Sequence, residues 1–330
     1  MTNAEAAASG PSVTLLVIAY RMRDTVAEAI TSAVAQTYPC EIVASDDSSG
    51  DGTLEAAREA ARSEPRVQVR STARNIGLCA HLNELAALAR GEILVCLSGD
   101  DVAYPQRVQR LVEAFAAHPE AQLVGSAVDD IDAQGTLLAS GVRAMPPRVD
   151  QRWLLRRGKL ATVLGASMAF RRELIADLPP LRGTVEDNML TLRATLVGEC
   201  LCLQQALLKY RLHGGNLNDR VFDRSSRDYA GYERRNRRVI AMYRDIAADQ
   251  RRCVAARPDL PGMRRELGLA LAGMYELEAE MREAILDRPR SQWFGPLWRG
   301  MRHPGLRRKS IERALKLVLP RRVFGRGLKA

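Results

Sequence analysis

Four segments suited to β-strands alternate with helical segments in the first hundred residues, and this alternation limits the possible folds most. The strand segments are Val13 to Ile18, Glu41 to Ser45, Val67 to Arg70 and Ile93 to Leu97. Three helical segments lie between them. The first runs from Asp24 or Thr25 to Gln36, the second starts near Thr53, and the third runs from about Leu78 to Ala89. Short strands that alternate with helices predict an α/β fold with a mostly parallel, doubly wound central sheet flanked by helices.

After the fourth strand segment the pattern is mixed, and it becomes helical in the last third of the chain. A helix is expected from Pro105 to His118 and a strand from Ala121 to Val128, and Ala161 to Phe170 fits either a strand pair or a buried loop. Two long helical segments, Tyr229 to Ala256 and Met263 to Leu286, follow. We therefore expect a disordered N-terminus at residues 1–10, an α/β domain at residues 11–218 and a helical extension at residues 219–330.

Positive charge is concentrated at the C-terminus. The formal net charge of +10 lies in residues 291–330, which hold eleven Lys and Arg against one acid, Glu312. Apolar residues recur there at helical spacing with basic residues between them, namely Ile311, Ala314, Leu315 and Val318 with Arg313 and Lys316, after Trp293, Phe294 and Trp298. This pattern predicts a basic amphipathic segment on an anionic membrane, with nucleic acid or packing on the α/β domain as alternatives.

Cysteine use and hydropathy indicate a cytoplasmic location. The six cysteines form no CxxC pair and no zinc spacing, so we expect reduced, buried side chains. The first residues lack the basic and apolar parts of a signal peptide, and there is no run of eighteen apolar residues. We expect a cytoplasmic protein, peripheral at the inner face of the cell membrane.

Polar residues follow three of the predicted strands. Tyr20 follows the first strand, Asp46 and Asp47 the second, and Asp100 and Asp101 the fourth. Ligands of doubly wound sheets bind outside the carboxyl ends of the strands, so these side chains are expected at one edge. Adjacent carboxylates suit a divalent cation such as Mg²⁺ or Mn²⁺ that carries a phosphate. The alternative is a turn that caps the helix starting near Pro105.

These motifs together resemble family 2 glycosyltransferases of the GT-A fold. The resemblance rests on the segment from Val13 to Tyr20, the loop DDSSGDGT at residues 46–53 and the GDD junction at residues 99–101 before Pro105. Later segments are similar to further landmarks of the family: NIGL at 75–78, Glu186 with Asp187, and YRLHGGN at 210–216. This family resemblance implies inverting transfer of a sugar from a UDP-, dTDP- or GDP-linked donor to a hydroxyl acceptor.

The resemblance also implies partners. Family members act in the assembly of bacterial cell-surface polysaccharides and lipid-linked glycans, so a glycan or lipid-linked acceptor is expected. Lipid-linked acceptors favour an anionic membrane surface over nucleic acid as the partner of the C-terminal segment. A nucleotidyltransferase and a non-catalytic, membrane-associated scaffold of the same fold remain as alternative functions.

Donor binding is implied for four residues of the predicted edge. Tyr20 is placed to stack on the base and Asp47 to accept a hydrogen bond from a ring NH, and Asp46 and Asp100 complete the donor contacts. A core-edge aromatic is the alternative for Tyr20, and helix capping is the alternative for Asp46.

The metal motif departs from the family pattern of Asp, any residue, Asp, because Ser98 stands in the first position. The ion is therefore expected to rely on Asp100, Asp101 and phosphate oxygens of the donor. His213 resembles a histidine that approaches the metal or diphosphate in some family members. The alternative is that His213 orders the loop at Gly214 and Gly215.

Asp187 is the expected catalytic base. Attack on the anomeric carbon requires the acceptor hydroxyl to lose its proton, and a carboxylate can accept it. The neighbouring Glu186 should raise one pKa of the pair, and a helix N-terminal charge is the alternative role. His81 and Asn83 match residues of some family members, but we assign them no chemical role.

Overall fold

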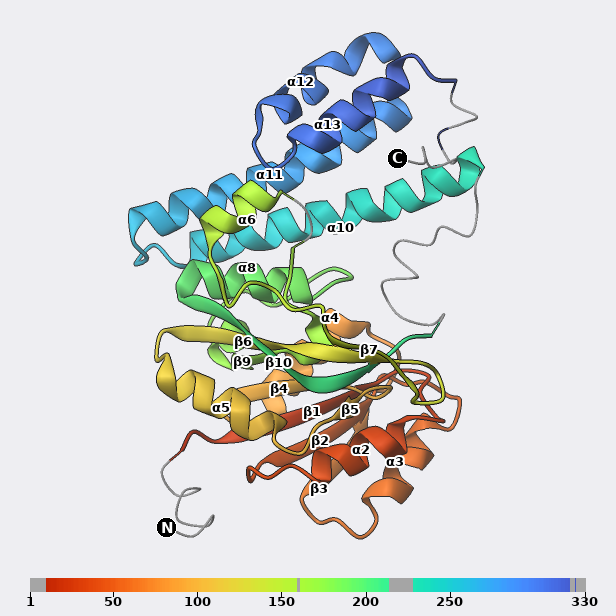
Figure 1. Cartoon of the computed structure of the whole chain (residues 1–330), viewed down its shortest axis with the longest axis vertical. Coiled ribbons are helices and arrows are strands. Elements are labelled where there is room, and N and C mark those ends of the chain that lie inside the picture. Colours follow the sequence, from red (N-terminus) through yellow and green to blue (C-terminus); the bar gives the residue numbers. More distant parts are fainter. Residues whose placement is uncertain (1–9, 159–160, 214–227, 321–323, 325–330) are drawn as a thin grey trace. The chain divides into compact units, whose positions relative to one another are not determined.

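The computed structural model describes residues 10–158, 161–213, 228–320 and 324. The chain divides into two compact units (Figure 1). The first comprises Met1–Asp150 and Thr162–Leu212, and the second comprises Gln151–Ala161 and His213–Ala330. The boundary expected near residue 218 and nearly all of the expected disordered N-terminus lie outside the described residues.

A mixed sheet forms the centre of the first unit. Its strand order is β3-β2-β1-β4-β9-β6-β10-β5, with β7 paired to β6 and β8 paired to β10. The first four strands pair in parallel and match the predicted segments within one residue or two: β1 Val13–Ala19, β2 Glu41–Asp46, β3 Val67–Ser71 and β4 Ile93–Ser98. The predicted α/β class with a mostly parallel sheet is confirmed.

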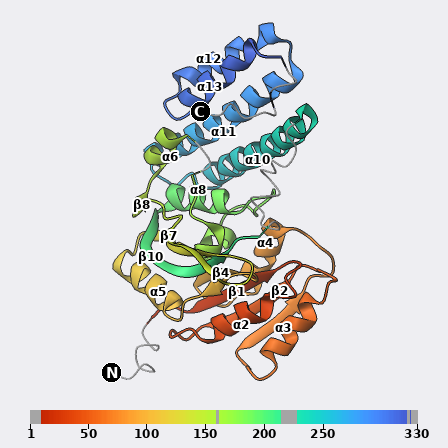
Figure 2. The ribbon, with the colours of Figure 1, turned by 45° about the vertical axis from the view of Figure 1, so that its right-hand side comes forward.

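Helices cover both faces of this half of the sheet. They are α2 (Val26–Val34), α3 (Thr53–Ala61), α4 (Leu78–Leu88) and α5 (Arg107–Ala117). α2 and α3 lie on one face and α4 lies on the other (Figure 2). Leu15 and Leu16 point to opposite faces of β1 and both are fully buried. Two-sided burial explains why β1 is a continuous apolar run instead of an alternating one.

The rest of the sheet mixes strand directions. β6 (Ala121–Ile131) and β10 (Glu199–Arg211) pair in parallel, and β9 (Ala169–Arg171) runs antiparallel between β4 and β6. Three short strands complete it: β5 (Val102–Ala103), β7 (Leu137–Val142) and β8 (Arg148–Val149). The segment with two interpretations, 161–170, contains a 3₁₀ turn, η1 (Gly165–Ser167), and the start of β9.

β10 has no counterpart among the predicted strands. Its pairing with β6 shifts register at three places, including the stretch from Leu203 to Ala206. Each bulge interrupts the two-residue alternation that marks a strand in a sequence, so the pattern fails although the strand is long. Two helices, α7 (Glu173–Ala176) and α8 (Asp187–Val197), precede it.

The second unit is helical. Two long helices, α10 (Tyr229–Ala256) and α11 (Gly262–Asp287), pack against each other and agree with the predicted segments. Shorter elements complete the unit: α6 (Gln151–Arg157), η2 (Arg290–Gln292), α12 (Phe294–Arg302), α13 (Arg307–Ala314) and η3 (Leu315–Leu317). Of the helices in the described ranges, none has the length and apolar character that crossing a membrane requires.

A buried ionic cluster joins α13 to α11. Arg313 Nη1 donates to Glu278 Oε2 at 2.7 Å, and Arg282 Nη2 donates to Glu278 Oε1 at 3.3 Å. Both Arg313 and Glu278 are buried. The interpretation of Arg313 as a basic residue of a membrane-facing surface is therefore wrong, because its charge is neutralised inside the unit.

Glu278→Ala should destabilise the second unit by about 3–5 kcal/mol, because it leaves buried Arg313 without its carboxylate. Urea unfolding followed by circular dichroism measures the change. Glu280→Ala is the matched control, because its ion pair with Arg299 is more exposed and should contribute at most about 1 kcal/mol. Equal effects of the two substitutions would contradict this account of the cluster.

Candidate active site

The register of three parallel strands brings the predicted residues to one edge. Ala19 of β1 lies opposite Asp46 of β2, and Ile18 lies opposite Ser98 of β4. The chain continues this pairing beyond the strands, since Asp47 N donates to Ala19 O and Gly99 N donates to Ile18 O, both at 2.9 Å. The segments that carry Tyr20, Asp46 with Asp47, and Asp100 with Asp101 therefore leave the sheet at the same edge.

Asp46 shapes the loop after β2. Its carboxylate accepts hydrogen bonds from Ser49 N at 3.0 Å and from the Ser49 hydroxyl. This closes a turn in which Ser48 has a positive φ of 56°. Asp46 caps no helix, because α3 begins after Gly52, and Asp51 accepts the hydrogen bond from Thr53 N.

Asp47 holds the loop that leads into α4. Its Oδ1 accepts hydrogen bonds from Thr72 Oγ1 at 2.9 Å and Ile76 N at 3.0 Å, and its Oδ2 accepts one from Gly77 N at 2.8 Å. Asp47 is buried, and Gly77 has a φ of 80°, which suits glycine. Each carboxylate oxygen can accept two hydrogen bonds, so Oδ2 keeps capacity for one more donor.

Asp101 has a buried carboxylate that is only partly hydrogen-bonded. It is 1% exposed, and its Oδ1 accepts a hydrogen bond from Arg211 N at 2.8 Å. Its Oδ2 is buried and has no hydrogen-bond partner in the described part of the chain. Burial, followed by the negative charge of Asp100, raises the pKa of Asp101 well above its usual value.

Asp100 and Asp101, called here the doublet, form a turn but do not cap α5. Asp101 N donates to Ser98 O at 3.1 Å, which closes the turn. α5 begins after Gln106, and no side chain caps it. The capping alternative for the doublet is therefore wrong, and the orphaned oxygen of Asp101 needs another explanation.

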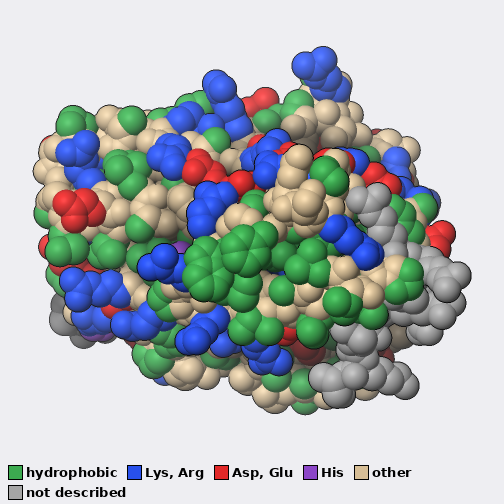
Figure 3. Space-filling model, turned by 90° about the horizontal axis from the view of Figure 1, so that it is seen from above, with side chains coloured by type: hydrophobic (Ala, Val, Ile, Leu, Met, Phe, Trp, Pro, Cys, Tyr) green, Lys and Arg blue, Asp and Glu red, His purple; other side chains and the backbone are tan. Residues whose placement is uncertain are grey.

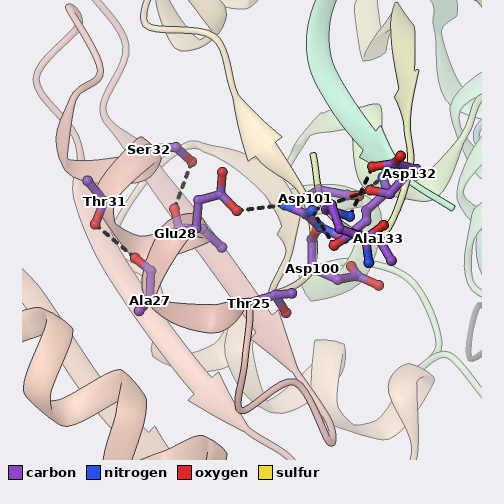
Figure 4. Close-up of polar contacts among 12 residues, drawn as sticks. Thr25, Ala27, Glu28, Thr31, Ser32, Asp100, Asp101, Asp132 and Ala133 are labelled. Carbon is purple, nitrogen blue, oxygen red and sulfur yellow. Dashed lines mark hydrogen bonds and ion pairs between the residues drawn. The ribbon is translucent and has the colours of Figure 1, made fainter. Parts of the chain in front are cut away.

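Arg211, at the end of β10, ties helix α2 and the turn after β6 to Asp100 and Asp101. Figure 4 shows its partners Glu28, Asp100, Asp101 and Ala133. Its Nε donates to Asp100 O at 2.8 Å, its Nη1 to Ala133 O at 3.0 Å, and its Nη2 to Glu28 Oε2 at 2.6 Å. Arg211 is 3% exposed. The sequence pattern included Arg211 only as part of the motif YRLHGGN. It did not predict these hydrogen bonds, because the partners of Arg211 are distant in the sequence.

Glu186 and Asp187 lie at the start of α8, as the motif predicted. Asp187 Oδ1 accepts hydrogen bonds from Asn188 N at 2.7 Å and Asn188 Nδ2 at 3.1 Å. Burial raises the pKa of both carboxyls, and the adjacent charge of Asp187 raises the pKa of Glu186 further. A Cβ at Gly165 would overlap Glu186 Oε1, so the backbone of η1 packs directly against this pair.

Arg107 connects this pair to the doublet's strand. Its Nη2 donates to Cys96 O of β4 at 2.6 Å and to Ala166 O of η1 at 2.7 Å. It is fully buried, and its Nε and Nη1 have no partner among the described residues. Arg107 therefore fixes η1, and with it the surface under Glu186, to the strand that ends at Ser98. No sequence pattern marks this role.

The two carboxylates of the doublet fit part of a cation site. Asp101 Oδ2 is a buried acceptor without a donor, beside the charge of Asp100, and hard divalent cations prefer such oxygens. Among the described residues, no group of three or more His, Cys, Asp or Glu side chains is placed to hold a metal ion. Ligands from a bound donor or from water would have to complete the coordination.

Two other predicted site residues, Tyr20 and His213, lie in different surroundings. Tyr20 is half-buried, with the Arg21 guanidinium 5.3 Å from its ring centroid. His213 is half-buried and belongs to the second unit, and Gly214 to Asn216 of its motif lie outside the described residues. The roles of Tyr20 and His213 stay predictions.

His81 and Asn83 have structural partners. His81 is buried, its Nε2 lies 2.6 Å from Ser45 Oγ, and burial lowers its pKa. The Asn83 amide donates to Leu181 O at 2.9 Å and accepts from Leu181 N at 3.0 Å. His81 thus anchors α4 to β2, and Asn83 anchors α4 to the segment before α8.

The sheet and the carboxylates at its edge define an α/β protein in which Asp46, Asp47, Asp100 and Asp101 gather where β1, β2 and β4 end. The model of the family described as glycosyl transferase family 2 matches residues 14–178, half of the chain. The chain belongs to the family 2 glycosyltransferases. The resemblance read from the motifs is confirmed.

Two bacterial relatives match part of the chain. EpsE of Bacillus subtilis is 33% identical over 140 residues, which are 42% of this chain and 49% of EpsE. The succinoglycan biosynthesis protein ExoO of Rhizobium meliloti is 39% identical over 123 residues, 37% of this chain and 34% of ExoO. The matched part thus spans about half of EpsE and a third of ExoO.

Solved structures share the fold over nearly the whole chain. TarS of S. aureus, solved in complex with UDP-GlcNAc, has a TM-score of 0.56 at 17% identity, with 93% of this chain and 81% of that chain covered. The mannosyltransferase PcManGT of Pyrobaculum calidifontis, solved with GDP-Man and Mn²⁺, has a TM-score of 0.53 at 18% identity, with 95% and 88% covered. At these identities the likeness establishes the GT-A fold.

Arg211→Met should lower the turnover of a nucleotide-sugar donor by about 100-fold, because small misplacements of catalytic groups have effects of that size. Steady-state kinetics measures it, and circular dichroism checks that the variant folds. Glu28→Gln is the control, since Glu28 is more than half exposed and supports only one end of the guanidinium. Full activity of Arg211→Met would exclude a positioning role.

Proposed function

We propose that this chain is a metal-dependent inverting glycosyltransferase that moves a sugar from a nucleotide-sugar donor to a hydroxyl acceptor. The observation that supports it best is Asp101 Oδ2, a buried carboxylate oxygen without a hydrogen-bond partner among the described residues, at the edge where β1, β2 and β4 end. An isolated buried charge is unfavourable unless a cation compensates it. The geometry therefore favours a ligand that brings positive charge to this oxygen.

The donor would bind along the same edge. Tyr20 would stack on the base, Asp47 would accept a ring NH on its remaining Oδ2 position, and Asp46 and Asp100 would line the sugar-phosphate side. UDP-, dTDP- and GDP-linked sugars all fit this description. TarS with UDP-GlcNAc and PcManGT with GDP-Man are examples of such donors on this fold.

Asp100 and Asp101 would hold a divalent metal ion, Mn²⁺ or Mg²⁺, with His213 as a further ligand. Such an ion, when bound, stabilises the negative charge that develops on a leaving diphosphate. Arg211 keeps the two carboxylates in place through Asp100 O and Asp101 Oδ1. The protein would thus preorganise the carboxylate oxygens of Asp100 and Asp101 before the sugar donor binds.

Asp187 would act as the general base. The acceptor oxygen attacks the anomeric carbon, its proton passes to the Asp187 carboxylate, and the bond from that carbon to the phosphate oxygen breaks with its electrons on the diphosphate. A single displacement inverts the configuration at the anomeric carbon. The raised pKa of this half-buried acid pair suits a group that must accept a proton.

Family membership and the relatives support one class of acceptor. We propose a glycan or lipid-linked acceptor in the assembly of a bacterial cell-surface polysaccharide. The name of ExoO states a role in succinoglycan biosynthesis for that protein. Such acceptors place the reaction in the cytoplasm at the inner face of the cell membrane.

Asp187→Asn should retain donor binding and lower sugar transfer by about 10²–10⁴-fold, because the amide cannot accept the proton. Product formation by mass spectrometry and donor binding by calorimetry separate the two effects. Asp177→Asn removes an exposed carboxylate nearby and should leave both unchanged. Substantial transfer by Asp187→Asn would refute the assignment, and metal-dependent release of pyrophosphate from a nucleoside triphosphate would favour a nucleotidyltransferase.

Asp101→Asn should abolish the part of donor-induced thermal stabilisation that depends on Mn²⁺. Binding at about one hundred times the dissociation constant stabilises the wild-type protein by about 2.7 kcal/mol. A panel of UDP-, GDP-, dTDP- and CDP-sugars, with and without Mn²⁺, identifies the nucleotide as well. Asp24→Asn, which removes an exposed acid, is the control. An unchanged Mn²⁺ effect in Asp101→Asn would place the metal elsewhere.

A further inference from the structure

α12, α13 and the turn after them expose large hydrophobic side chains to solvent. Half of the ten exposed large hydrophobic residues among those described lie within this short segment. They are Phe294 (64% exposed), Trp298 (48%), Ile311 (48%), Leu315 (53%) and Val318 (81%). Figure 3, which looks onto this end of Figure 1, shows hydrophobic side chains gathered in the middle of the face. Neighbouring exposed hydrophobic residues of this size usually mark an interaction surface.

The exposed residues form an outward face of helices whose inward face is already filled. Trp293, just before α12, and Leu297 within it are buried, whereas Phe294 and Trp298, four residues apart, are exposed with stacked rings whose centroids are 5.8 Å apart. In α13, Ser310 is buried, while Ile311 and the following exposed residues recur at helical spacing. No described part of the chain covers this face.

Basic residues surround this face, and two of them form no salt bridge within the part of the chain that the structure describes. Glu312 is the only acid in α12 and α13. Arg299 pairs with Glu280, and Arg308 and Lys309 pair with Glu312. Arg302 and Arg307 are exposed and form no salt bridge with a described residue. Figure 3 shows Lys and Arg side chains around the hydrophobic centre.

We propose that this face docks on an anionic lipid membrane, with Phe294, Trp298, Ile311, Leu315 and Val318 in the headgroup region and Arg302 and Arg307 on lipid phosphates. We call these seven residues the docking face. Aromatic rings favour the membrane interface, and unpaired arginines favour anionic headgroups.

Charge and chemistry favour a membrane over other partners. A second copy of this chain would bring two basic surfaces together, which like charges oppose. Nucleic acid would use the arginines but leaves the aliphatic side chains of Ile311, Leu315 and Val318 without a role. A membrane surface satisfies both kinds of side chain at once.

The structure changes which residues meet the membrane relative to the sequence pattern. Trp293 is buried and its indole NH donates to Arg288 O at 2.9 Å. Lys316 Nζ lies 2.8 Å from the Tyr232 hydroxyl and 4.2 Å from the centroid of its ring. Together with buried Arg313, these residues hold the unit together and are absent from the docking face.

Docking would keep the chain at the surface in which a lipid-linked acceptor is anchored. Only this consequence rests on the proposed function. The binding itself requires no donor, metal or acceptor, so it can be tested separately.

Co-sedimentation of the full chain with vesicles tests the proposal. We expect binding to vesicles of phosphatidylcholine with phosphatidylglycerol, weaker binding to phosphatidylcholine alone, and loss of affinity at high salt. Arg302→Gln and Arg307→Gln should each weaken binding about fivefold, which corresponds to about 1 kcal/mol per charge. Trp298→Ala with Leu315→Ala should weaken it about tenfold or more.

Tryptophan fluorescence gives a second readout. Of the three tryptophans, Trp293 is buried, Trp153 is half-buried and outside the docking face, and Trp298 is 48% exposed. A blue shift on adding anionic vesicles should therefore come from Trp298 and disappear in Trp298→Phe, which keeps the other two tryptophans. Met263→Ala with Leu269→Ala, an exposed apolar pair on α11, is the matched control and should bind vesicles like the wild type.

Three outcomes would overturn the proposal: no binding to anionic vesicles, equal binding to neutral vesicles, or equal binding by the docking-face variants. A concentration-dependent dimer that Trp298→Ala abolishes would assign the face to a second copy instead. Asp187→Asn should bind vesicles normally, and docking-face variants should keep transfer to a soluble acceptor. Failure of the docking face and failure of the proposed function are thus distinguishable.

Discussion

The parallel pairing of β1 with β2 on one side and β4 on the other is the constraint on which the site depends. Parallel strands end at the same edge, and the register places Ala19 beside Asp46 and Ile18 beside Ser98. A slip of one residue would turn the carboxylates toward the other face of the sheet. The close packing of the β1 side chains opposes such a slip, because a shift of one residue would exchange side chains of different shape, such as those of Leu15 and Leu16, between the two packed faces.

The acids at this edge lie in an environment that opposes their charge. Burial raises the pKa of Asp101 and of Glu186, while the arginines that could neutralise them are used mainly to hold the backbone. Arg107 donates to Cys96 O and Ala166 O, and Arg211 donates to Asp100 O. Incomplete compensation of buried acids is typical of functional sites, since a fully neutralised carboxylate has little affinity left for a cation or a proton.

The hydrophobic periodicity and the turn residues of the sequence predict the first four strands and the long helices well. β1 and β4 are buried apolar runs, β2 and β3 are short strands between turn residues, and α10 and α11 carry a helical repeat over many turns. β10 could not be predicted, because its bulges break the alternation. The roles of Arg107 and Arg211 could not be predicted either, because an arginine in a sequence does not reveal which distant carbonyls it will meet.

The sequence by itself determined the α/β class, the edge at which Asp46, Asp47, Asp100 and Asp101 gather, and membership of the glycosyltransferase family. Those conclusions follow from local patterns, in which each strand and its terminal residues are neighbours in the chain. Only the tertiary structure decided that Asp101 Oδ2 lacks a partner among the described residues, that Arg313 is internal, and that Trp293 is buried while Phe294 beside it is exposed. Burial and hydrogen bonding depend on segments distant in sequence, and a linear pattern does not specify how these pack.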